Sequence, residues 1–345
     1  MFNKTATLLL VILVLFSILQ CAKQPAVKQD VSIDHFVGRW ALSLSGGAGW
    51  LEVRQEENYL DADILWYGGS VIPVDNVVFK DNTLIITRNR RVIRKKDEAG
   101  NPIRTQTLTT LLELFLKEGE LIGKQISPKK DGIGVEVNEF TGKKIPDLPA
   151  APDLSGIKFG QPITLFNGKD LAGWELIDST RQNGFKVEDG ALINNVVQVD
   201  GQPHIHYGNL RTVEKFEDFN LKMQVNIPKG SNSGIYLRGI YEVQVYDSYK
   251  KGLDSHHMGA IYSRITPTVA AEKPAGLWQD FDITLCDRHV TVILNGKKII
   301  NNQPLLGVTG GALTADEFSP GPIYFQGDHG IVSYRNIVLT PIVNL

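Results

Sequence analysis

The sequence predicts an all-β protein, and three observations support this prediction. The chain has 345 residues, of which 33 are glycine, and its Val, Ile, Thr and Tyr residues fall in short runs separated by turn signals. Along many of these runs apolar and polar residues alternate with period two, as they do in half-buried antiparallel strands. No segment shows sustained helical periodicity. A chain of this length is long enough for two domains, each with its own core.

Residues 1–21 are predicted to be a signal segment outside the fold. Lys4 is followed by an apolar run from Ala6 to Leu19, which is too short and wrongly flanked for a membrane span. The run closes at Cys21, as in a bacterial lipoprotein signal, where the cysteine thiol is lipidated. A plain signal peptide with an incidental cysteine is the alternative. Residues 22–33 then form a polar tether, and we expect an exported protein of the bacterial cell envelope, in the periplasm or at the outer membrane, that contacts the membrane only through its lipid anchor.

Residues 34–144 are predicted to form a separate antiparallel β-domain. Its expected strands cover residues 50–56, 59–66, 83–87, 105–116 and 120–127. The run from Gly38 to Trp40 resembles the Gly-x-Trp start of lipocalin-type barrels, although a curved sheet fits equally and Trp40 is also explained as a core aromatic. Arg88, Arg90, Arg91, Arg94, Lys95 and Lys96 precede a polar turn, and such a basic run is typical of a solvated hairpin end.

A proline-rich linker, residues 145–159, precedes a second β-domain at residues 160–345. Pro146, Pro149 and Pro152 give the linker a semi-extended character. Strands are expected in the second domain at residues 184–193, 219–226, 234–238, 241–246, 281–285, 290–294, 322–326 and 332–339, and Asn295-Gly296 is a hairpin turn signal. Eight strands are enough for a β-sandwich.

The most informative stretch runs from Gly230 to Asp247, where two alternating strands are joined by a short turn at Gly239. Period-two alternation places Tyr236 and Arg238 on one face of the first strand. The same rule places Glu242, Gln244 and Tyr246 on one face of the second strand, beside the first row. These are hydrogen-bonding and stacking groups, which favours a binding face over a merely solvated one. Asp247 would join this face only at a strand end or a bulge.

These residues resemble the 3-keto-disaccharide hydrolase domain family, once described only as a domain of unknown function. The resemblance covers about residues 160–342 and rests on ordered motifs at residues 165–174, 230–247, 259–262, 273–278, 292–297 and 326–337. One departure is Leu277, where the family more often has a polar residue before the Trp. The resemblance implies a concanavalin A-like jelly-roll sandwich with sugars lying across its concave sheet.

The resemblance also implies a chemistry that starts from a sugar oxidised at its 3-hydroxyl. A base removes the acidified hydrogen at C2, the C1 substituent leaves, and water adds to the resulting enone. A separate sugar oxidoreductase would supply the 3-keto-glycoside. Glu242 is the expected base, Arg238 the enolate stabiliser and His329 a proton donor or second base. The expected substrate-binding residues are Tyr236, Gln244, Tyr246, Asp247, Gln326 and Asp328, of which Asp328 also orients His329.

Several of these residues have a simpler interpretation. Glu242 and Arg238 could be a cross-strand ion pair with no catalytic role. Trp174 and Trp278 are expected in the core. His204, His206, His256 and His257 are expected at the surface, although a divalent metal held by His206, Glu242 or His257 stays open. No cofactor is otherwise expected.

Three classes of function therefore remain: the 3-keto-glycoside hydrolase, a non-catalytic carbohydrate-binding lipoprotein, and a two-carboxylate glycoside hydrolase. The last needs two acids at a set separation, and the sequence offers only Glu242 as an evident one. A formal charge of −2 gives no electrostatic footprint for nucleic acid. Besides Cys21 the chain has only Cys286, in an apolar strand, so a disulfide framework is excluded and Cys286 is expected to be a buried apolar residue.

Overall fold

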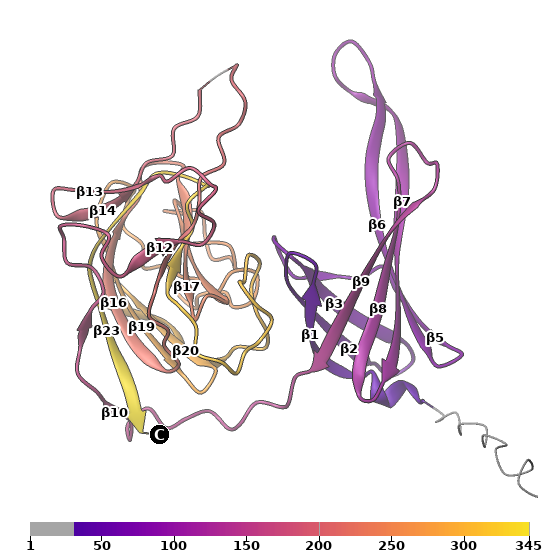
Figure 1. Ribbon diagram of the computed structural model, residues 1–345, viewed down its shortest axis with the longest axis horizontal. Helices are drawn as coiled ribbons and strands as arrows, with labels where there is room; N and C mark the ends of the chain where they lie inside the picture. The colour runs from indigo at the N-terminus through magenta and orange to yellow at the C-terminus, as the bar shows by residue number, and fades with distance from the viewer. Residues whose placement is uncertain (1–30, 200, 345) are drawn as a thin grey trace, which may run out of the picture.

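The computed structural model describes residues 31–199 and 201–344, and it shows an all-β chain folded into two domains (Figure 1). The predicted signal segment, Cys21 and most of the tether lie outside the described residues. Among those residues the sole helix is the short 3₁₀ helix η1 (Ile33–His35). The described part of the chain contains no helix with the length and hydropathy needed to cross a membrane. The predicted fold class is confirmed.

The first domain is an antiparallel sheet curled into a barrel. Its strand order is β4-β3-β2-β1-β9-β8-β7-β6-β5. The strands are β1 (Gly38–Leu44), β2 (Gly47–Gln55), β3 (Leu60–Trp66), β4 (Ile72–Pro73), β5 (Asn76–Lys80), β6 (Thr83–Lys96), β7 (Pro102–Lys117), β8 (Glu120–Pro128) and β9 (Val135–Lys144). The β4–β5 connection links the two ends of the sheet, because Val74 N donates to Ala62 O on β3 and Asp75 N donates to Thr87 O on β6.

Apolar side chains fill the barrel, with η1 at one end. Trp40 is 1 % exposed and packs with Phe36, Leu42, Leu51 and Ile64. Its indole N–H donates to Phe36 O at 2.8 Å, so the polar end of the ring is also satisfied. Trp40 is therefore a core aromatic, as one of the two interpretations predicts. At the opposite end of the barrel, β6 and β7 project as a long hairpin (Figure 1).

The second domain is a sandwich of two sheets. One has the order β13-β14-β23-β16-β19-β20-β21, with β10 and β11 also paired to β23, and the other has the order β12-β15-β22-β17-β18. The first sheet contains β10 (Lys158–Phe159), β11 (Ile163–Thr164), β13 (Phe185–Glu188), β14 (Ala191–Asn194), β16 (Phe219–Asn226), β19 (Gln279–Cys286), β20 (His289–Leu294), β21 (Lys297–Pro304) and β23 (Val332–Asn344). The second contains β12 (Trp174–Leu176), β15 (Leu210–Thr212), β17 (Asn232–Leu237), β18 (Tyr241–Tyr246) and β22 (Tyr324–Phe325).

The sandwich core lies between the two sheets. Inward side chains such as Leu221, Ile235, Val243, Ile283 and Phe325 are fully buried there. Trp174 is 7 % exposed, as predicted, and Cys286 is buried. The single strand expected over residues 184–193 is wrong. These residues form the β13–β14 hairpin instead, because Asp189 and Gly190 both adopt positive φ angles and reverse the chain.

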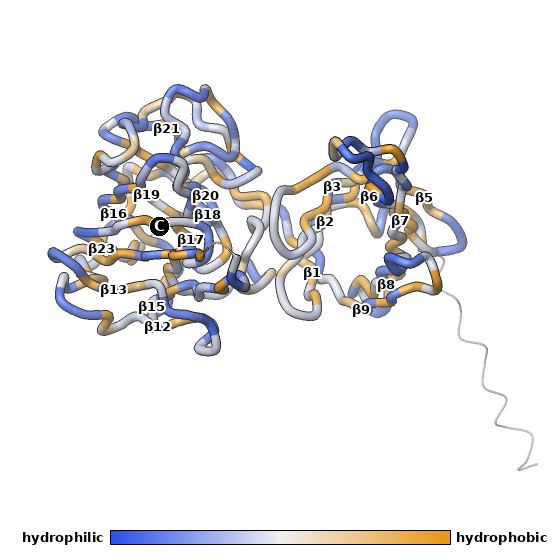
Figure 2. The backbone as a smooth tube through the Cα atoms, turned by 90° about the horizontal axis from the view of Figure 1, so that it is seen from above, coloured by the Kyte–Doolittle hydropathy of each residue, from blue (hydrophilic) through white to orange (hydrophobic). Residues whose placement is uncertain are grey.

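The two domains lie side by side and share buried surface. Figure 2 shows β1 to β3 nearest to the second domain and β5 to β9 on the far side of the barrel. Ala48, Trp50 and Leu65 of the barrel join the hydrophobic cluster of the sandwich. The Arg264 guanidinium stacks on the Trp50 ring, 4.1 Å from its centroid. Ser70 Oγ lies 2.8 Å from His256 Nε2, and Val71 N donates to Ser263 Oγ at 3.0 Å.

Candidate active site

The candidate active site is built on the outer face of the β17–β18 hairpin. Tyr236 lies opposite Glu242 in the strand register, and Gly234 lies opposite Gln244. A Cβ atom at Gly234 would come within 2.3 Å of Glu242 Oε1. The carboxylate therefore lies across Gly234, which explains why a glycine stands inside this strand.

A cavity of about 230 Å³ opens over this hairpin face. Its side-chain lining comes from several segments that are distant in the sequence: Asn232, Tyr236, Glu242, Gln244, Tyr262, Gln326 and His329. The structure therefore brings together the predicted residues Tyr236, Glu242, Gln244, Gln326 and His329. Asn232 and Tyr262 were not predicted. Asn232 could have been, since it precedes Tyr236 by four residues and shares its face by the period-two rule.

Glu242 is 3 % exposed, and burial raises the pKa of its carboxyl from the usual 4.5 to about 8. Two contacts oppose this rise: the hydrogen bond with the Tyr236 hydroxyl, at 2.8 Å to Oε2, and the charge of His329. Gln326 Nε2 donates to the same hydroxyl at 3.0 Å, and Gly310 O lies 2.7 Å from it. The hydroxyl proton can therefore go to Gly310 O when Glu242 is protonated and to Glu242 when it is ionised.

Tyr236 is held rigidly beneath the carboxyl. Its ring stacks on Tyr324, with centroids 3.8 Å apart and planes 13° from parallel. Tyr324 is fixed in turn, because its hydroxyl donates to Gly311 O at 2.6 Å. Burial raises the pKa of Tyr236 well above its ordinary value, so this phenol stays protonated and remains a donor.

His329 lies on the loop after β22 and pairs with Asp328 through Nδ1. This hydrogen bond raises the pKa of His329 and lowers the pKa of Asp328, so the pair favours an imidazolium next to a carboxylate. Both side chains are nearly half exposed. The site thus combines a buried acid with a high pKa and an accessible cationic histidine, and their different surroundings separate their protonation behaviour.

Two buried acceptor atoms at the cavity have no partner among the described residues. They are Asn232 Oδ1 and Gln326 Oε1. A buried polar atom without a hydrogen bond is costly, and both residues line the cavity. Hydroxyl groups of a bound ligand could satisfy both atoms.

The first domain supplies part of the cavity wall through Gly68 and Gly69. Gly311 N donates to Tyr67 O at 3.1 Å, which fixes this loop against the second domain. A Cβ atom at Gly310 would stand 2.2 Å from Gly69 O, so the two backbones touch. The site is therefore formed by both domains.

The predicted role of Arg238 is not supported by its position. β17 ends at Leu237, and Arg238 adopts a positive φ of 52° that takes its side chain out of the alternating row. The guanidinium is buried elsewhere and donates to Glu317 O and Ser319 O. Among the described residues, Arg238 forms no ion pair with Glu242 and does not line the cavity. The cross-strand ion pair is therefore wrong, and the position of Arg238 gives no support to its predicted role as enolate stabiliser.

The remaining predicted binding residues lie at the edge of the site or beyond it. Both polar atoms of the Gln244 amide already have a hydrogen-bond partner in the protein: Nε2 donates to His256 O, and Oε1 accepts from Val245 N. Tyr246 continues the Glu242 row but lies outside the cavity, where Lys251 Nζ donates to its hydroxyl. Asp247 stands at the strand end and accepts a hydrogen bond from Gly230 N, which is turn chemistry.

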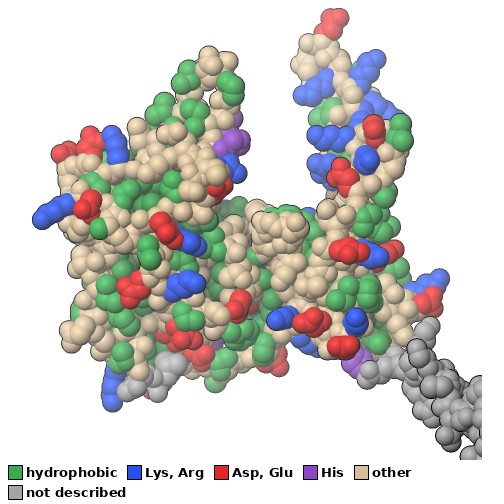
Figure 3. Space-filling view, in the orientation of Figure 1, with side chains coloured by type: hydrophobic (Ala, Val, Ile, Leu, Met, Phe, Trp, Pro, Cys, Tyr) green, Lys and Arg blue, Asp and Glu red, His purple; other side chains and the backbone are tan. Residues whose placement is uncertain are grey.

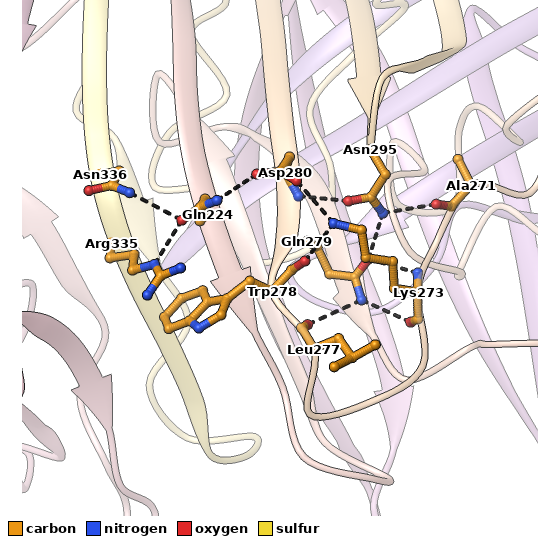
Figure 4. Close-up of polar contacts among 10 residues, drawn as sticks. All are labelled: Gln224, Ala271, Lys273, Leu277, Trp278, Gln279, Asp280, Asn295, Arg335 and Asn336. Carbon is orange, nitrogen blue, oxygen red and sulfur yellow. Dashed lines mark hydrogen bonds and ion pairs between the residues drawn. The ribbon is translucent and has the colours of Figure 1, made fainter.

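The motif at residues 273–278 lies on the outer face of the other sheet (Figure 4). Trp278 is half-buried beneath the Arg335 guanidinium, 3.9 Å from the ring centroid, so its predicted core position is wrong. Arg335 Nε donates to Gln224 Oε1, and Gln224 Nε2 donates to Asp280 Oδ1. Leu277 is 51 % exposed and contributes its carbonyl to Gln279. This motif stabilises the sheet far from Glu242.

The histidines form no metal centre in the described part of the chain, where no group of three or more His, Cys, Asp or Glu residues could hold an ion. His204 and His206 are exposed, as predicted, and their rings contact each other. His256 and His257 are half-buried, and His256 bonds to Asp254 and Ser70. The positions of these side chains therefore give no support to the divalent metal site that the sequence left open.

The fold and the site together define a jelly-roll domain with a polar, acid-containing pocket on one sheet. The chain belongs to the family of the 3-keto-alpha-glucoside-1,2-lyase-like domain, whose model matches residues 161–340. The family predicted from the motifs is therefore confirmed.

The chain is also similar to a curated protein and to solved structures. A 3-keto-disaccharide hydrolase from Bacteroides thetaiotaomicron is 29 % identical over 143 residues, which cover 34 % of this chain and 49 % of the relative. The chain thus spans about half the length of the curated relative it matches. Two solved structures from Parabacteroides distasonis, provisionally named glycosyl hydrolases, are 28 % and 23 % identical, with TM-scores of 0.42 and 0.43. The matches cover 56 % and 53 % of this chain and 93 % and 94 % of those chains. With TM-scores below 0.5, these structures add no argument to the family match.

Proposed function

We propose that the protein cleaves 3-keto-glycosides by eliminating the C1 substituent and then hydrating the product. The observation that carries this proposal is the Glu242 carboxyl, which is buried in a polar cavity and has a pKa of about 8. A general base works best when its pKa lies near the working pH. The family and the name of the Bacteroides relative support the same substrate class.

The reaction proceeds in two stages. The Glu242 carboxylate removes the proton from C2, and the bonding electrons move toward the C3 carbonyl oxygen to give an enolate. The enolate then expels the oxygen at C1, which takes a proton from the His329 imidazolium. Water then adds to C1 of the enone and gives one proton to His329, which restores the imidazolium, while C2 recovers its proton from Glu242. The net change is hydrolysis.

Other residues would support this chemistry. The Asn232 side-chain amide forms no hydrogen bond within the described residues and would donate to the enolate oxygen, the role that the sequence had suggested for Arg238. Tyr236 would hold the Glu242 carboxylate by its hydrogen bond once the proton has been lost. Gln326 would accept a sugar hydroxyl through its unpaired Oε1.

A carbohydrate-binding protein without catalysis is the second candidate, because the same unpaired acceptors would hold a sugar. The two-carboxylate glycosidase has less support: among the described residues that line the cavity, Glu242 is the one carboxylate. Asp328 is nearby but is engaged by His329. We also propose that the chain is exported and lipidated at Cys21.

The experiment is to incubate the purified protein with a 3-keto-glucoside and with the matching unoxidised glucoside, following the release of the aglycone. We expect release from the keto substrate alone, and its loss in Glu242→Gln, which keeps the size of the side chain but cannot act as a base. Binding of the keto substrate without release by the wild-type protein would identify a binding protein. Equal release from both substrates would contradict elimination.

A further inference from the structure

A second cavity lies in the first domain, away from Glu242. It has a volume of about 840 Å³ and lies at the end of the barrel where the β6–β7 hairpin projects. Arg88 and Arg90 of β6 line it together with Ile72, Pro73, Leu108 and Thr110. Figure 3 shows Lys and Arg side chains gathered along this hairpin.

The arginines occupy the inner face of β6. Leu84 and Ile86 point into the barrel core and are fully buried. Since side chains on a strand alternate with period two, Arg88 and Arg90 continue the same inward row. A solvated hairpin would turn its charges outward at these positions, as β6 does with Arg91. The inner row therefore changes from leucine and isoleucine to arginine where the barrel opens.

Arg88 lacks the partner that a half-buried cation requires. Its Nε is buried and has no hydrogen-bond partner among the described residues. Burial lowers the pKa of Arg88, and the nearby Asp75 opposes this shift. The Asp75 carboxylate accepts instead from Asn89 N, at 2.5 Å. A desolvated guanidinium without an acceptor is costly, and a bound oxyanion would supply one.

The rest of the lining is mixed rather than uniformly basic. Lys129 and Lys130 add positive charge at the rim, and Asp131 and Glu136 add negative charge. Thr110 Oγ1 and Ser127 Oγ lie 3.1 Å apart within the hollow. Carboxylates accept hydrogen bonds from alcohols, and hydroxyls both accept and donate them. This lining therefore suits a ligand with several hydroxyl groups as well as an anionic group.

The hollow is held open by its own contacts. Arg94 Nε donates to Gln106 Oε1 on β7 at 2.8 Å, and its Nη1 donates to Lys130 O on the opposite loop. These bonds fix the hairpin and the β8–β9 loop around the cavity. The arginines at its base are therefore presented on regular strands rather than on free loops.

We propose that this hollow binds a saccharide that carries an oxyanion, with its carboxylate or phosphate at Arg88 and Arg90. Guanidinium groups bind both anions in a two-bond fork. The hydroxyls would bond to Asp75, Thr110 and Ser127, and Pro73 and Leu108 would pack against an apolar face of the ring. A neutral sugar would leave Arg88 Nε unpaired.

One short segment of the first domain connects the hollow with the candidate active site. Gly68 and Gly69 line the Glu242 cavity, and Ile72 and Pro73 line the hollow. The intervening residues Ser70 and Val71 are bonded to the second domain. Three extended residues span about 10 Å, so an acidic oligosaccharide could contact both cavities. The binding proposal itself does not depend on cleavage.

The test is calorimetric titration of the purified protein with glucuronate, glucose 6-phosphate and glucose. The comparison uses Arg88→Gln and, as a matched control, Arg91→Gln, which removes the same charge from the outer face of the same strand. We expect the wild-type protein to bind glucuronate, glucose 6-phosphate or both, and to bind glucose at least tenfold more weakly. The Arg88→Gln variant should bind the anionic sugar at least tenfold more weakly than the wild type does. Arg91→Gln should change affinity less than twofold.

The outcomes distinguish a carboxylate ligand from a phosphate ligand, and they also show when the proposal fails. Binding of glucuronate alone identifies a carboxylate ligand, and binding of glucose 6-phosphate alone identifies a phosphate ligand; both support the proposal. Arg88→Lys, which keeps the charge but loses the fork, should recover only part of the affinity. Binding by none of the three probes, equal binding of glucose, or equal losses in Arg88→Gln and Arg91→Gln would overturn it. Glu242→Gln should bind these probes as the wild type does, so failure of the proposed cleavage leaves this result intact.

Discussion

Replacing Glu242 by Gln should make the protein's stability less sensitive to pH. In the unfolded chain the carboxyl has its usual pKa of 4.5, and burial raises it to about 8 in the fold. The folded state therefore holds this proton more tightly than the unfolded state between these two values. The stabilising effect is fully present below pH 4.5 and is lost as the pH rises through 8.

The magnitude follows from the pKa. Moving a carboxyl pKa from 4.5 to about 8 corresponds to about 5 kcal/mol of unfolding free energy. The Glu242→Gln side chain cannot ionise, so the variant does not lose this unfolding free energy as the pH rises. The unfolding free energy of the variant, relative to the wild type, should therefore rise by about 5 kcal/mol between pH 4 and pH 9, and by about 3 kcal/mol already at pH 7.

Urea unfolding followed by near-ultraviolet circular dichroism at pH 5, 7 and 9 measures this difference. Glu214→Gln is the control, because Glu214 is exposed and should leave the pH dependence unchanged. A constant difference between Glu242→Gln and the wild type across this pH range would refute the reasoning. It would mean that Glu242 is ionised in the fold at neutral pH.

Three further predictions concern activity, the domain contact and export. If Glu242 is the base, kcat/KM for a 3-keto-glucoside should rise about tenfold per pH unit at pH values below 8. It should fall again at higher pH, where the proton donor His329 is deprotonated. A flat pH profile would exclude these roles. Gly310→Ala should destabilise the protein by about 1–3 kcal/mol and reduce turnover, because the new Cβ would meet Gly69 O. Gly156→Ala is the control, because its new Cβ would lie 3.8 Å from the nearest atom, Asp153 O. Urea unfolding and activity assays should show neither change in this variant. Cys21→Ser should abolish the incorporation of labelled palmitate in expressing cells, and undiminished labelling would disprove lipidation at this cysteine.

Much of the fold could be predicted because hydrophobic alternation reports which strand faces are buried. The strands expected at residues 219–226 and 241–246 match β16 and β18 at both ends. The prediction is worse where local signals compete. Thr83–Lys96 is one continuous strand, although its second half is basic, because β7 pairs with it nearly to the end. Cross-strand hydrogen bonds depend on the backbone, so a run of charged side chains does not end a strand.

Strand periodicity predicted the part of the candidate site on β17 and β18, whereas Gln326 and His329, which follow β22, were predicted from the family resemblance. Tyr236, Glu242 and Gln244 were correctly placed on one face, since β17 and β18 are regular. Arg238 failed because it lies one residue beyond the strand, in a left-handed conformation. The period-two rule has no meaning there. Positive φ is uncommon for an arginine, so nothing in the local sequence indicates that Arg238 adopts it next to Gly239.

The glycines at the domain contact show what a single sequence does not reveal. Gly68 and Gly69 lie in the first domain, and Gly310 and Gly311 lie about 240 residues later, yet all four line the Glu242 cavity. Nothing in the local pattern of either pair indicates that it faces the other. Their lack of side chains lets the two backbones meet while leaving room above Glu242. If the cavity is the active site, the first domain therefore helps to set which sugars can enter it, and substitutions at Gly68 should alter substrate size preference without touching the acid itself.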